Sequence, residues 1–152
     1  MQIWDTCGQE IYRSLISSFY RNASLAMMVY SIDSKESFIH IETWLKEVKL
    51  QSNPDIKIFL IGNKADLEEQ REVKLEQAKL YKNENDIHYF CETSAKNGLN
   101  AQEVFIEAAK LLYKEYISLK PNFDEPSDAD DTVVINSSNG VNDRDDSTSR
   151  CC

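Results

Sequence analysis

The chain has 152 residues, of which 41% are hydrophobic and 28% charged, and its formal net charge is −9 at pH 7. This length and composition indicate one soluble globular domain with a sizeable core. The longest apolar run, LAMMVY, is too short to cross a bilayer, and we expect no signal peptide because no charged start precedes a long apolar stretch. The acidic balance excludes a basic surface for nucleic acid.

The four cysteines form no metal-binding pattern. Cys7 and Cys91 stand alone, and the adjacent Cys151 and Cys152 cannot easily pair with each other. We therefore expect reduced thiols in a cytosolic compartment.

The charge is unevenly distributed along the chain. Residues 121–152 carry eight acidic and two basic side chains, whereas residues 1–120 carry 18 acidic and 15 basic ones. The last segment is rich in Ser, Asn and Asp and almost free of aromatic side chains, so it cannot bury enough apolar surface to order itself. We expect a folded body over residues 1–120 and a disordered acidic tail over residues 121–152.

The first half of the body predicts two strands and a helix. MQIW at 1–4 and SLAMMVYS at 24–31 are apolar runs of strand length. Residues 33–52 carry apolar side chains at helical spacing, with Asp33 and Glu36 placed as a capping pair and an Asn-Pro pair as the stop. The apolar face of this predicted helix consists of Phe38, Ile41, Leu45 and Val48.

The second half predicts strand, helix, strand and helix. IKIFLIGNK at 56–64 is typical of a buried strand and should end at Gly62, and a short helix follows at 73–85. IHYFCET at 87–93 is the next strand, and residues 100–116 form the last helix. Its expected cap is Asn100 with Glu103, and its expected apolar face is Ala101, Val104, Phe105, Ala108, Leu111 and Leu112.

Strands and helices alternate along the body, which predicts a parallel sheet with helices on both faces. Ligands of such sheets bind in the loops at the carboxyl ends of the strands. Three polar segments lie at such ends: DTCGQE after MQIW, NKAD after IFLIG, and ETSAK after HYFC. The candidate site therefore draws on three separate stretches of chain.

Together and in this order, the three segments resemble the nucleotide site of small GTPases of the Ras superfamily. DTCG resembles the D-x-x-G segment, NKAD the N-K-x-D segment, and SAK the S-A-K loop. The stretch YRSLISSFYRNASLAMMVYSID and the terminal Cys-Cys are similar to the Rab branch. The resemblance implies a P-loop NTPase-like, Rossmann-like α/β fold with a mostly parallel sheet and helices on both faces. Compared with the complete family domain, the first two strands and the first helix would be missing.

The second and third segments are expected to read the base of the nucleotide. A carboxylate at Asp66 can accept parallel hydrogen bonds from N1 and the exocyclic amine of guanine, which adenine does not offer. By resemblance, Asn63 holds the base edge and the neighbouring loop, and the N–H of Ala95 donates to guanine O6. The stems of two lysines would cover the base faces. The nucleotide-binding residues implied here are Asn63, Lys64, Asp66, Ser94, Ala95 and Lys96.

The first segment is implied to serve the phosphates. Asp5 would hold Mg²⁺ through water, the N–H of Gly8 would face the γ-phosphate, and Gln9 would orient the attacking water as the catalytic residue. Cys7 stands where Rab proteins usually have Ala, and Ser31 replaces a usual Asp. A small thiol tolerates burial and a hydroxyl can still cap a loop, so both departures should have modest effects.

The aromatic residues near the first segment have two open interpretations. Trp4 and Phe19 fit ordinary packing or, by resemblance, an aromatic patch that contacts effectors. The face assigned to switch II and effectors consists of Trp4, Tyr12, Arg13, Phe19 and Tyr20. His40 and His88 lie in apolar stripes and are assigned to packing rather than catalysis.

The family's phosphate loop, G-x-x-x-x-G-K-[ST], and its switch I have no counterpart in this sequence. We expect the chain to begin at an internal Met in the family's third strand, through a gene model, a splice form or a deliberate truncation. In the family's strand order, 2-3-1-4-5-6, the first strand lies beside the third, so MQIW would lack its central partner. We therefore expect a fragment that binds nucleotide weakly or not at all.

The resemblance implies a Rab-type switch that binds GTP and GDP with Mg²⁺ and hydrolyses GTP in vesicle trafficking, an activity that we expect to need the missing third. Implied partners are exchange factors, GTPase-activating proteins, effectors and the Rab escort and prenyltransferase machinery. Prenylation of Cys151 and Cys152 would anchor the protein to the cytoplasmic face of endomembranes, from which it would cycle with the cytosol. The alternative is a non-catalytic, lipid-anchored binding module that presents its switch II face.

Overall fold

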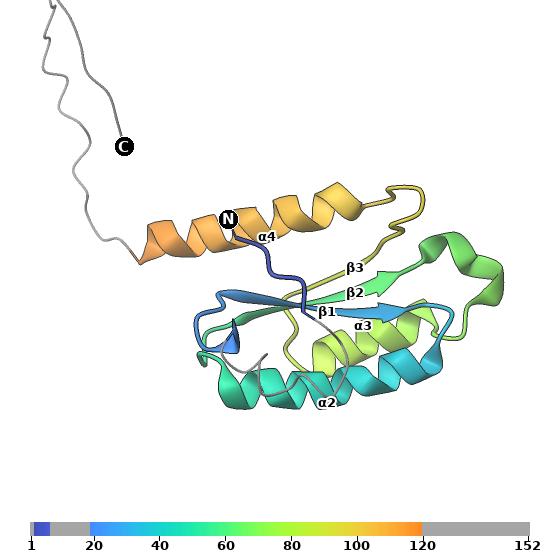
Figure 1. The fold of residues 1–152 in the computed structure, drawn as a ribbon, viewed down its shortest axis with the longest axis horizontal. Helices are drawn as coiled ribbons and strands as arrows, with labels where there is room; N and C mark the ends of the chain where they lie inside the picture. Colours follow the sequence, from blue (N-terminus) through green and yellow to red (C-terminus); the bar gives the residue numbers. More distant parts are fainter. Residues whose placement is uncertain (1, 7–18, 120–152) are drawn as a thin grey trace, which may run out of the picture. The chain divides into compact units, whose positions relative to one another are not determined.

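The computed structural model describes residues 2–6 and 19–119. Within them, one parallel sheet has the strand order β1-β2-β3, formed by Leu25–Ser31, Lys57–Asn63 and Tyr89–Glu92 (Figure 1). The helices that connect and follow these strands are α2 (Lys35–Gln51), the 3-10 helix η2 (Ala65–Gln70), α3 (Leu75–Glu84) and α4 (Ala101–Ser118). None of the helices in these residues is long and apolar enough to cross a membrane.

Helices cover both faces of the sheet, α2 and α3 on one and α4 on the other (Figure 1). Side chains of β2 alternate between two cores, because successive residues of a strand point to opposite faces. Ile58 and Leu60 join the core that includes residues of α2 and α3, whereas Phe59 and Ile61 pack with residues of α4. The predicted α/β fold with a parallel sheet is therefore confirmed.

The register of the sheet brings two of the predicted site segments together. Gly62 of β2 lies opposite Glu92 of β3, so the segments that follow them leave the sheet side by side. The N–H of Thr93 extends this ladder by donating to the carbonyl of Gly62 at 2.8 Å. The carboxyl ends of β2 and β3 thus form one edge, as the strand-helix alternation predicted.

The helix predicted over 33–52 is α2, and its four predicted apolar residues are all buried. The predicted cap is wrong by one residue. Ser34 is the N-cap, and its hydroxyl oxygen accepts a hydrogen bond from the N–H of Ser37 at 3.2 Å. Asp33 cannot fill this position because its carboxylate is engaged by the hydroxyl of Ser31 and the ammonium of Lys64.

The last predicted helix is α4, and its predicted cap is also wrong. Asn100 stands at the N-cap position in a left-handed conformation, with φ of 53°, and makes no side-chain cap. Its amide instead donates to the carbonyl of Glu92 at 2.9 Å. Val104 and Ala108 are buried as predicted, but Phe105 is 38% exposed because the buried stripe runs along the neighbouring face.

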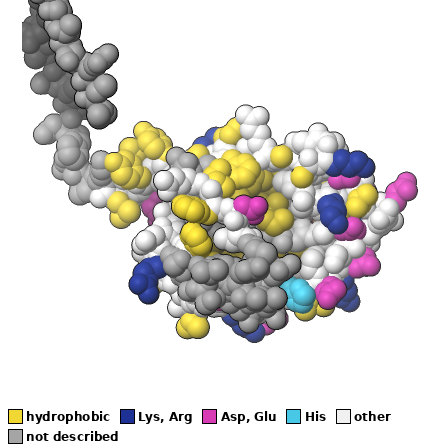
Figure 2. All heavy atoms as spheres, viewed as in Figure 1, with side chains coloured by type: hydrophobic (Ala, Val, Ile, Leu, Met, Phe, Trp, Pro, Cys, Tyr) yellow, Lys and Arg dark blue, Asp and Glu magenta, His cyan; other side chains and the backbone are white. Residues whose placement is uncertain are grey.

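The strand predicted for MQIW is absent from the described residues 2–6, which have no regular secondary structure. None of the three described strands pairs with them. A strand is stabilised by hydrogen bonds to a neighbour, so an apolar run without such a neighbour has no reason to stay extended. Ile3 and Trp4 are 63% and 64% exposed, and hydrophobic side chains are visible at the surface in Figure 2. The tail predicted over 121–152 lies outside the described residues.

Candidate functional site

The site lies where β2 and β3 end, and backbone hydrogen bonds join its two loops. β2 ends at Asn63, and Lys64 then turns the chain in a left-handed conformation, with φ of 63°, into η2. The N–H of Ala65 donates to the carbonyl of Thr93 at 2.9 Å. The loop after β2 is thereby fixed against the loop after β3 before any side chain is considered.

Asn63 links the two loops through its side chain. Its Oδ1 accepts a hydrogen bond from the N–H of Ala95 at 3.2 Å and lies 3.4 Å from the hydroxyl of Thr93. The contact joins Asn63 to the loop after β3, and its role at a base edge stays a prediction. The N–H of Ala95 was predicted to donate to a ligand, but in this structure it donates to Asn63. To bind a ligand, it would have to leave Asn63 or donate to both acceptors.

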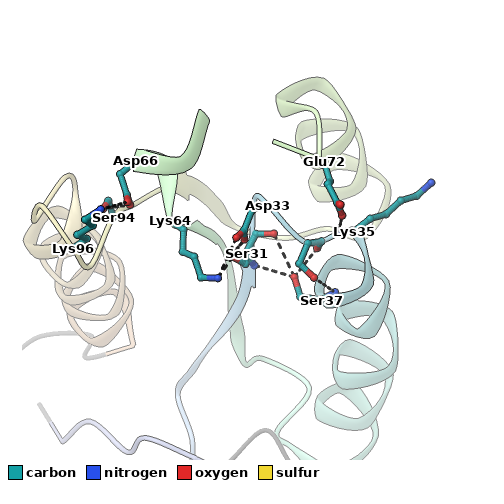
Figure 3. A network of polar contacts seen from close by, with 10 residues as sticks. Ser31, Asp33, Lys35, Ser37, Lys64, Asp66, Glu72, Ser94 and Lys96 are labelled. Atoms are coloured by element: carbon teal, nitrogen blue, oxygen red, sulfur yellow. Dashed lines mark hydrogen bonds and ion pairs between the residues drawn. The ribbon is translucent and has the colours of Figure 1, made fainter. Parts of the chain in front are cut away.

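Asp66 presents a mostly enclosed carboxylate, 15% exposed, at the start of η2. Its Oδ1 accepts a hydrogen bond from the hydroxyl of Ser94 at 2.5 Å, and its Oδ2 lies 3.8 Å from Nζ of Lys96 (Figure 3). The Ser94 hydrogen bond holds the pKa of Asp66 below its ordinary value, with help from Lys96 and against the opposing effect of burial. Asp66 is therefore a charged acceptor at neutral pH, with lone pairs left for a ligand.

Ser94 is fully buried and shapes the loop that carries the predicted S-A-K segment. Its N–H donates to the carbonyl of Leu99, its carbonyl accepts from the N–H of Gly98, and its hydroxyl oxygen accepts from the N–H of Asn97 at 3.3 Å. Gly98 has φ of +81°, a conformation that favours glycine. Ser94 was predicted among the nucleotide-binding residues, and in this structure it lies behind Asp66 and orients the carboxylate.

The two predicted lysines differ in how they are held. Lys96 is 80% exposed, and its ion-pair partner among the described residues is Asp66. Lys64 is 51% exposed, and its Nζ lies 3.3 Å from Oδ2 of Asp33 (Figure 3). The hydroxyl of Ser31 is the main cause that lowers the pKa of Asp33, and Lys64 adds to it. Sequence reasoning foresaw the loop-capping role of Ser31 but not the ion pair that holds Lys64.

The remaining predicted residues are placed as follows. Asp5 is exposed in the segment 2–6, and Trp4 packs on Phe19 with ring centroids 5.0 Å apart. Tyr20 is half-buried against the core under α2 and α3. His40 and His88 are both exposed rather than packed, and Nδ1 of His88 accepts a hydrogen bond from the N–H of Ile58 at 3.2 Å. The predicted residues outside the described ranges are Cys7, Gly8, Gln9, Tyr12, Arg13, Cys151 and Cys152.

The structure thus brings Asn63, Asp66, Ser94, Ala95 and Lys96 into contact with one another, and their role toward a base stays a prediction. Within residues 2–6 and 19–119, no group of three or more His, Cys, Asp or Glu side chains could hold a metal ion. Sequence reasoning missed Arg71, which follows η2 and joins it to the end of β3 by donating two hydrogen bonds to the carboxylate of Glu92. No sequence signal distinguished it, because charged residues surround it in the chain.

Comparison with known proteins gives a family match over most of the chain. The model of the Ras family matches residues 1–114. Ras-related protein RHN1 of Nicotiana plumbaginifolia is 48% identical over 111 residues, which are 73% of this chain and 55% of the relative. Ras-related protein Rab5 of Nicotiana tabacum shows the same identity and coverage. The chain therefore spans about half the length of the curated relatives that it matches.

Proposed function

The chain belongs to the Ras family, in its Rab branch, and from this premise we propose that the edge formed by β2 and β3 reads the guanine base of GDP and GTP. The observation that carries the proposal is the Asp66 carboxylate, which the buried Ser94 hydroxyl holds in place at 2.5 Å. A fixed, ionised carboxylate is the group that a pair of adjacent N–H donors requires.

Guanine offers such a pair in N1–H and its exocyclic amine, and adenine offers no equivalent pair. One oxygen of Asp66 is already bonded to Ser94, and each carboxylate oxygen can accept more than one hydrogen bond. The Asn63 side chain and the Ala95 N–H would complete the base edge, and the stems of Lys64 and Lys96 would cover its faces. This arrangement of acceptors and lysine stems supports a planar ligand with two hydrogen-bond donors on one edge.

The phosphate half of the function rests on residues outside the described ranges, together with Asp5. In the complete family domain, the Gly8 N–H would meet the γ-phosphate and Gln9 would orient the water that attacks it. Mg²⁺, when bound, would neutralise charge on the phosphates, and Asp5 would hold it through water. Hydrolysis of GTP to GDP and phosphate is therefore proposed for the whole protein that carries these residues with a phosphate loop.

Similarity to Rab5 supports a role as a switch in vesicle trafficking, with exchange factors, GTPase-activating proteins and effectors as partners. The terminal Cys151 and Cys152 support prenylation by the Rab escort and transferase machinery, and hence attachment to endomembranes. Trp4 and Phe19 are a candidate effector surface because both rings are exposed and in contact. Family membership favours this function over the alternative of a non-catalytic, lipid-anchored binding module.

The base-reading proposal is tested in a restored chain, which is this chain preceded by a phosphate-loop segment of the family. The wild-type restored chain should prefer GDP to xanthosine diphosphate, because xanthine has a carbonyl where guanine has its amine. Asp66→Asn should reverse this preference, since an amide can donate to that carbonyl. Dissociation rates of labelled nucleotides would measure it, and an unchanged preference in the Asp66→Asn variant would refute the assignment.

A further inference from the structure

Arg71 follows η2 directly, and its guanidinium, 15% exposed, joins both site loops. Nη1 and Nη2 donate to Oε1 and Oε2 of Glu92 at 2.7 and 2.8 Å. Nε and Nη2 also donate to the two carboxylate oxygens of Glu68 at 2.9 and 2.5 Å. A further hydrogen bond runs from Nη1 to the carbonyl of Val73 at 3.0 Å. All donor directions of the side chain are thereby engaged.

The two carboxylates belong to the two halves of the site. Glu68 lies in η2, two residues after Asp66. Glu92 ends β3, two residues before Ser94. The planar guanidinium therefore connects the segment after β2 with the end of β3. A bidentate guanidinium fixes orientation as well as distance, which a lysine ammonium cannot do.

Glu92 is partly buried and packs close to Gly62. A Cβ added at Gly62 would lie 3.2 Å from Cγ of Glu92, so the carboxylate stem is packed against the β2 backbone. The side chain is 17% exposed, and such a partly buried carboxylate needs a charged partner. Arg71 is the ion-pair partner of Glu92 among the described residues. Loss of the two hydrogen bonds from Arg71 to Glu92 would let the end of β3 move, and with it the loop whose Ser94 holds Asp66.

We propose that Arg71 is a positioning residue for base recognition, because it locks the Asp66 loop and the Ser94 loop at the separation that a guanine edge requires. The proposal rests on the proposed function of the same site. Recognition by two parallel hydrogen bonds tolerates displacements of the acceptor of only about 0.5 Å. If the loops shift relative to each other, the carboxylate can therefore accept only one of the two hydrogen bonds. Arg71 itself is not assigned a contact with the base; it directly follows η2 and acts through Glu92 at the end of β3.

The structure offers a matched set of variants for the test. Arg71→Lys keeps the positive charge and removes the planar fork. Glu68→Gln alters the contact of Arg71 within its own loop and leaves the bond to Glu92 across the two loops, and Glu68 is 68% exposed. We expect the first substitution to disturb the site and the second to leave it unchanged.

The first readout needs no nucleotide. Amide hydrogen exchange in the full chain would be followed at Ala65 and Ala95, whose N–H groups bond across the loops, and at Val48 in α2 as a reference. Arg71→Lys should speed exchange at the two site amides about tenfold or more and leave Val48 within about twofold. Equal acceleration at all three amides, or no change at any, would overturn the positioning role.

The second readout is the ratio of GDP to inosine diphosphate affinity in the restored chain. Inosine lacks the exocyclic amine, so this ratio reports whether the Asp66 carboxylate reaches both donors. Arg71→Lys should lower the ratio about tenfold, roughly the value of one charge-assisted hydrogen bond, while Glu68→Gln keeps it. An equal loss for both nucleotides would refute positioning. A wild-type chain without any preference would instead refute the proposed function and leave the exchange result to decide the role of Arg71.

Discussion

Replacing Gly62 with alanine should destabilise the fold, and replacing Tyr30 with phenylalanine should recover part of the loss. A Cβ at Gly62 would lie 2.8 Å from the Tyr30 hydroxyl oxygen and 3.0 Å from its Cζ. Such approaches are closer than van der Waals contact, so the ring or the strand must shift. The ring has little room to do so, because Tyr30 is 2% exposed and packs edge-on against Phe38 with centroids 4.9 Å apart.

The size of the effect follows from overpacking, which costs about 1–3 kcal/mol in a close-packed core. We expect Gly62→Ala to cost about 2 kcal/mol in the wild-type background. Tyr30→Phe removes the nearest atom and leaves Cζ, so the cost in that background should fall by about 1 kcal/mol. The Tyr30 hydroxyl is buried and has no hydrogen-bond partner among the described residues, and burial raises its pKa. Tyr30→Phe alone should therefore be neutral or slightly stabilising.

Urea unfolding of the four proteins of this cycle, followed by circular dichroism, would give the coupling free energy. Tyr81→Phe is the matched control, since the Tyr81 hydroxyl is also buried without a partner in the described part of the chain but is not among the atoms nearest to Gly62. It should not reduce the cost of Gly62→Ala. Strict additivity of Gly62→Ala and Tyr30→Phe, or a loss above about 1 kcal/mol for Tyr30→Phe alone, would refute the reasoning.

The 152-residue chain itself should bind GDP weakly or not at all in calorimetric titration, since its sequence contains no phosphate loop, and tight Mg²⁺-dependent binding would contradict this expectation. In the restored chain, Gln9→Leu should slow GTP hydrolysis about tenfold or more with GDP affinity kept, and equal hydrolysis rates would remove Gln9 from its role. A carbon-13 NMR titration should place the pKa of Asp66 below its ordinary value of 3.8, and Ser94→Ala should raise it; an unchanged value would show that the Ser94 hydroxyl does not act on the carboxylate. Because the folded pKa is the lower one, the stabilisation by Asp66 should be complete above the unfolded value and lost as the pH falls through the folded value. Cell fractionation of the restored chain should show that Cys151→Ser and Cys152→Ser each release most of the protein from membranes; full retention of the double variant would exclude the anchor, and full retention of either single variant would exclude the need for two lipids.

Most of the described secondary structure could be predicted because its signals are local. The helical spacing of Phe38, Ile41, Leu45 and Val48 placed α2, and all four are buried. The strand at MQIW could not be judged locally, since a strand depends on a neighbour that is distant in the sequence.

The two wrong caps have the same cause. Asp33 is a good capping residue, but the fold brings it to Lys64, 31 residues later, and the ion pair takes its carboxylate. Asn100 likewise uses its amide on the carbonyl of Glu92, eight residues earlier, instead of on its own helix. Capping rules describe an isolated helix end, and both ends lie at the site, where longer-range partners compete.

The candidate site consists of residues proposed to contact the ligand and of residues that hold those residues in position. The first kind could be predicted from the sequence, and the second could not. Asn63 and Asp66 could be predicted because they stand in a segment that follows a strand and resembles N-K-x-D. Arg71 could not, because three glutamates stand within three residues of it in the chain. Glu72, its neighbour, accepts instead from the N–H of Lys35 at 2.8 Å, whereas Glu92, 21 residues away, receives the guanidinium fork. The pairing of β2 with β3 determines that Arg71 bonds to Glu92, because it sets Gly62 opposite Glu92. The Glu92 side chain fits beside residue 62 because glycine has no side chain. The support of the site is thus a property of sheet register and close packing, so it is visible only once the strands are aligned.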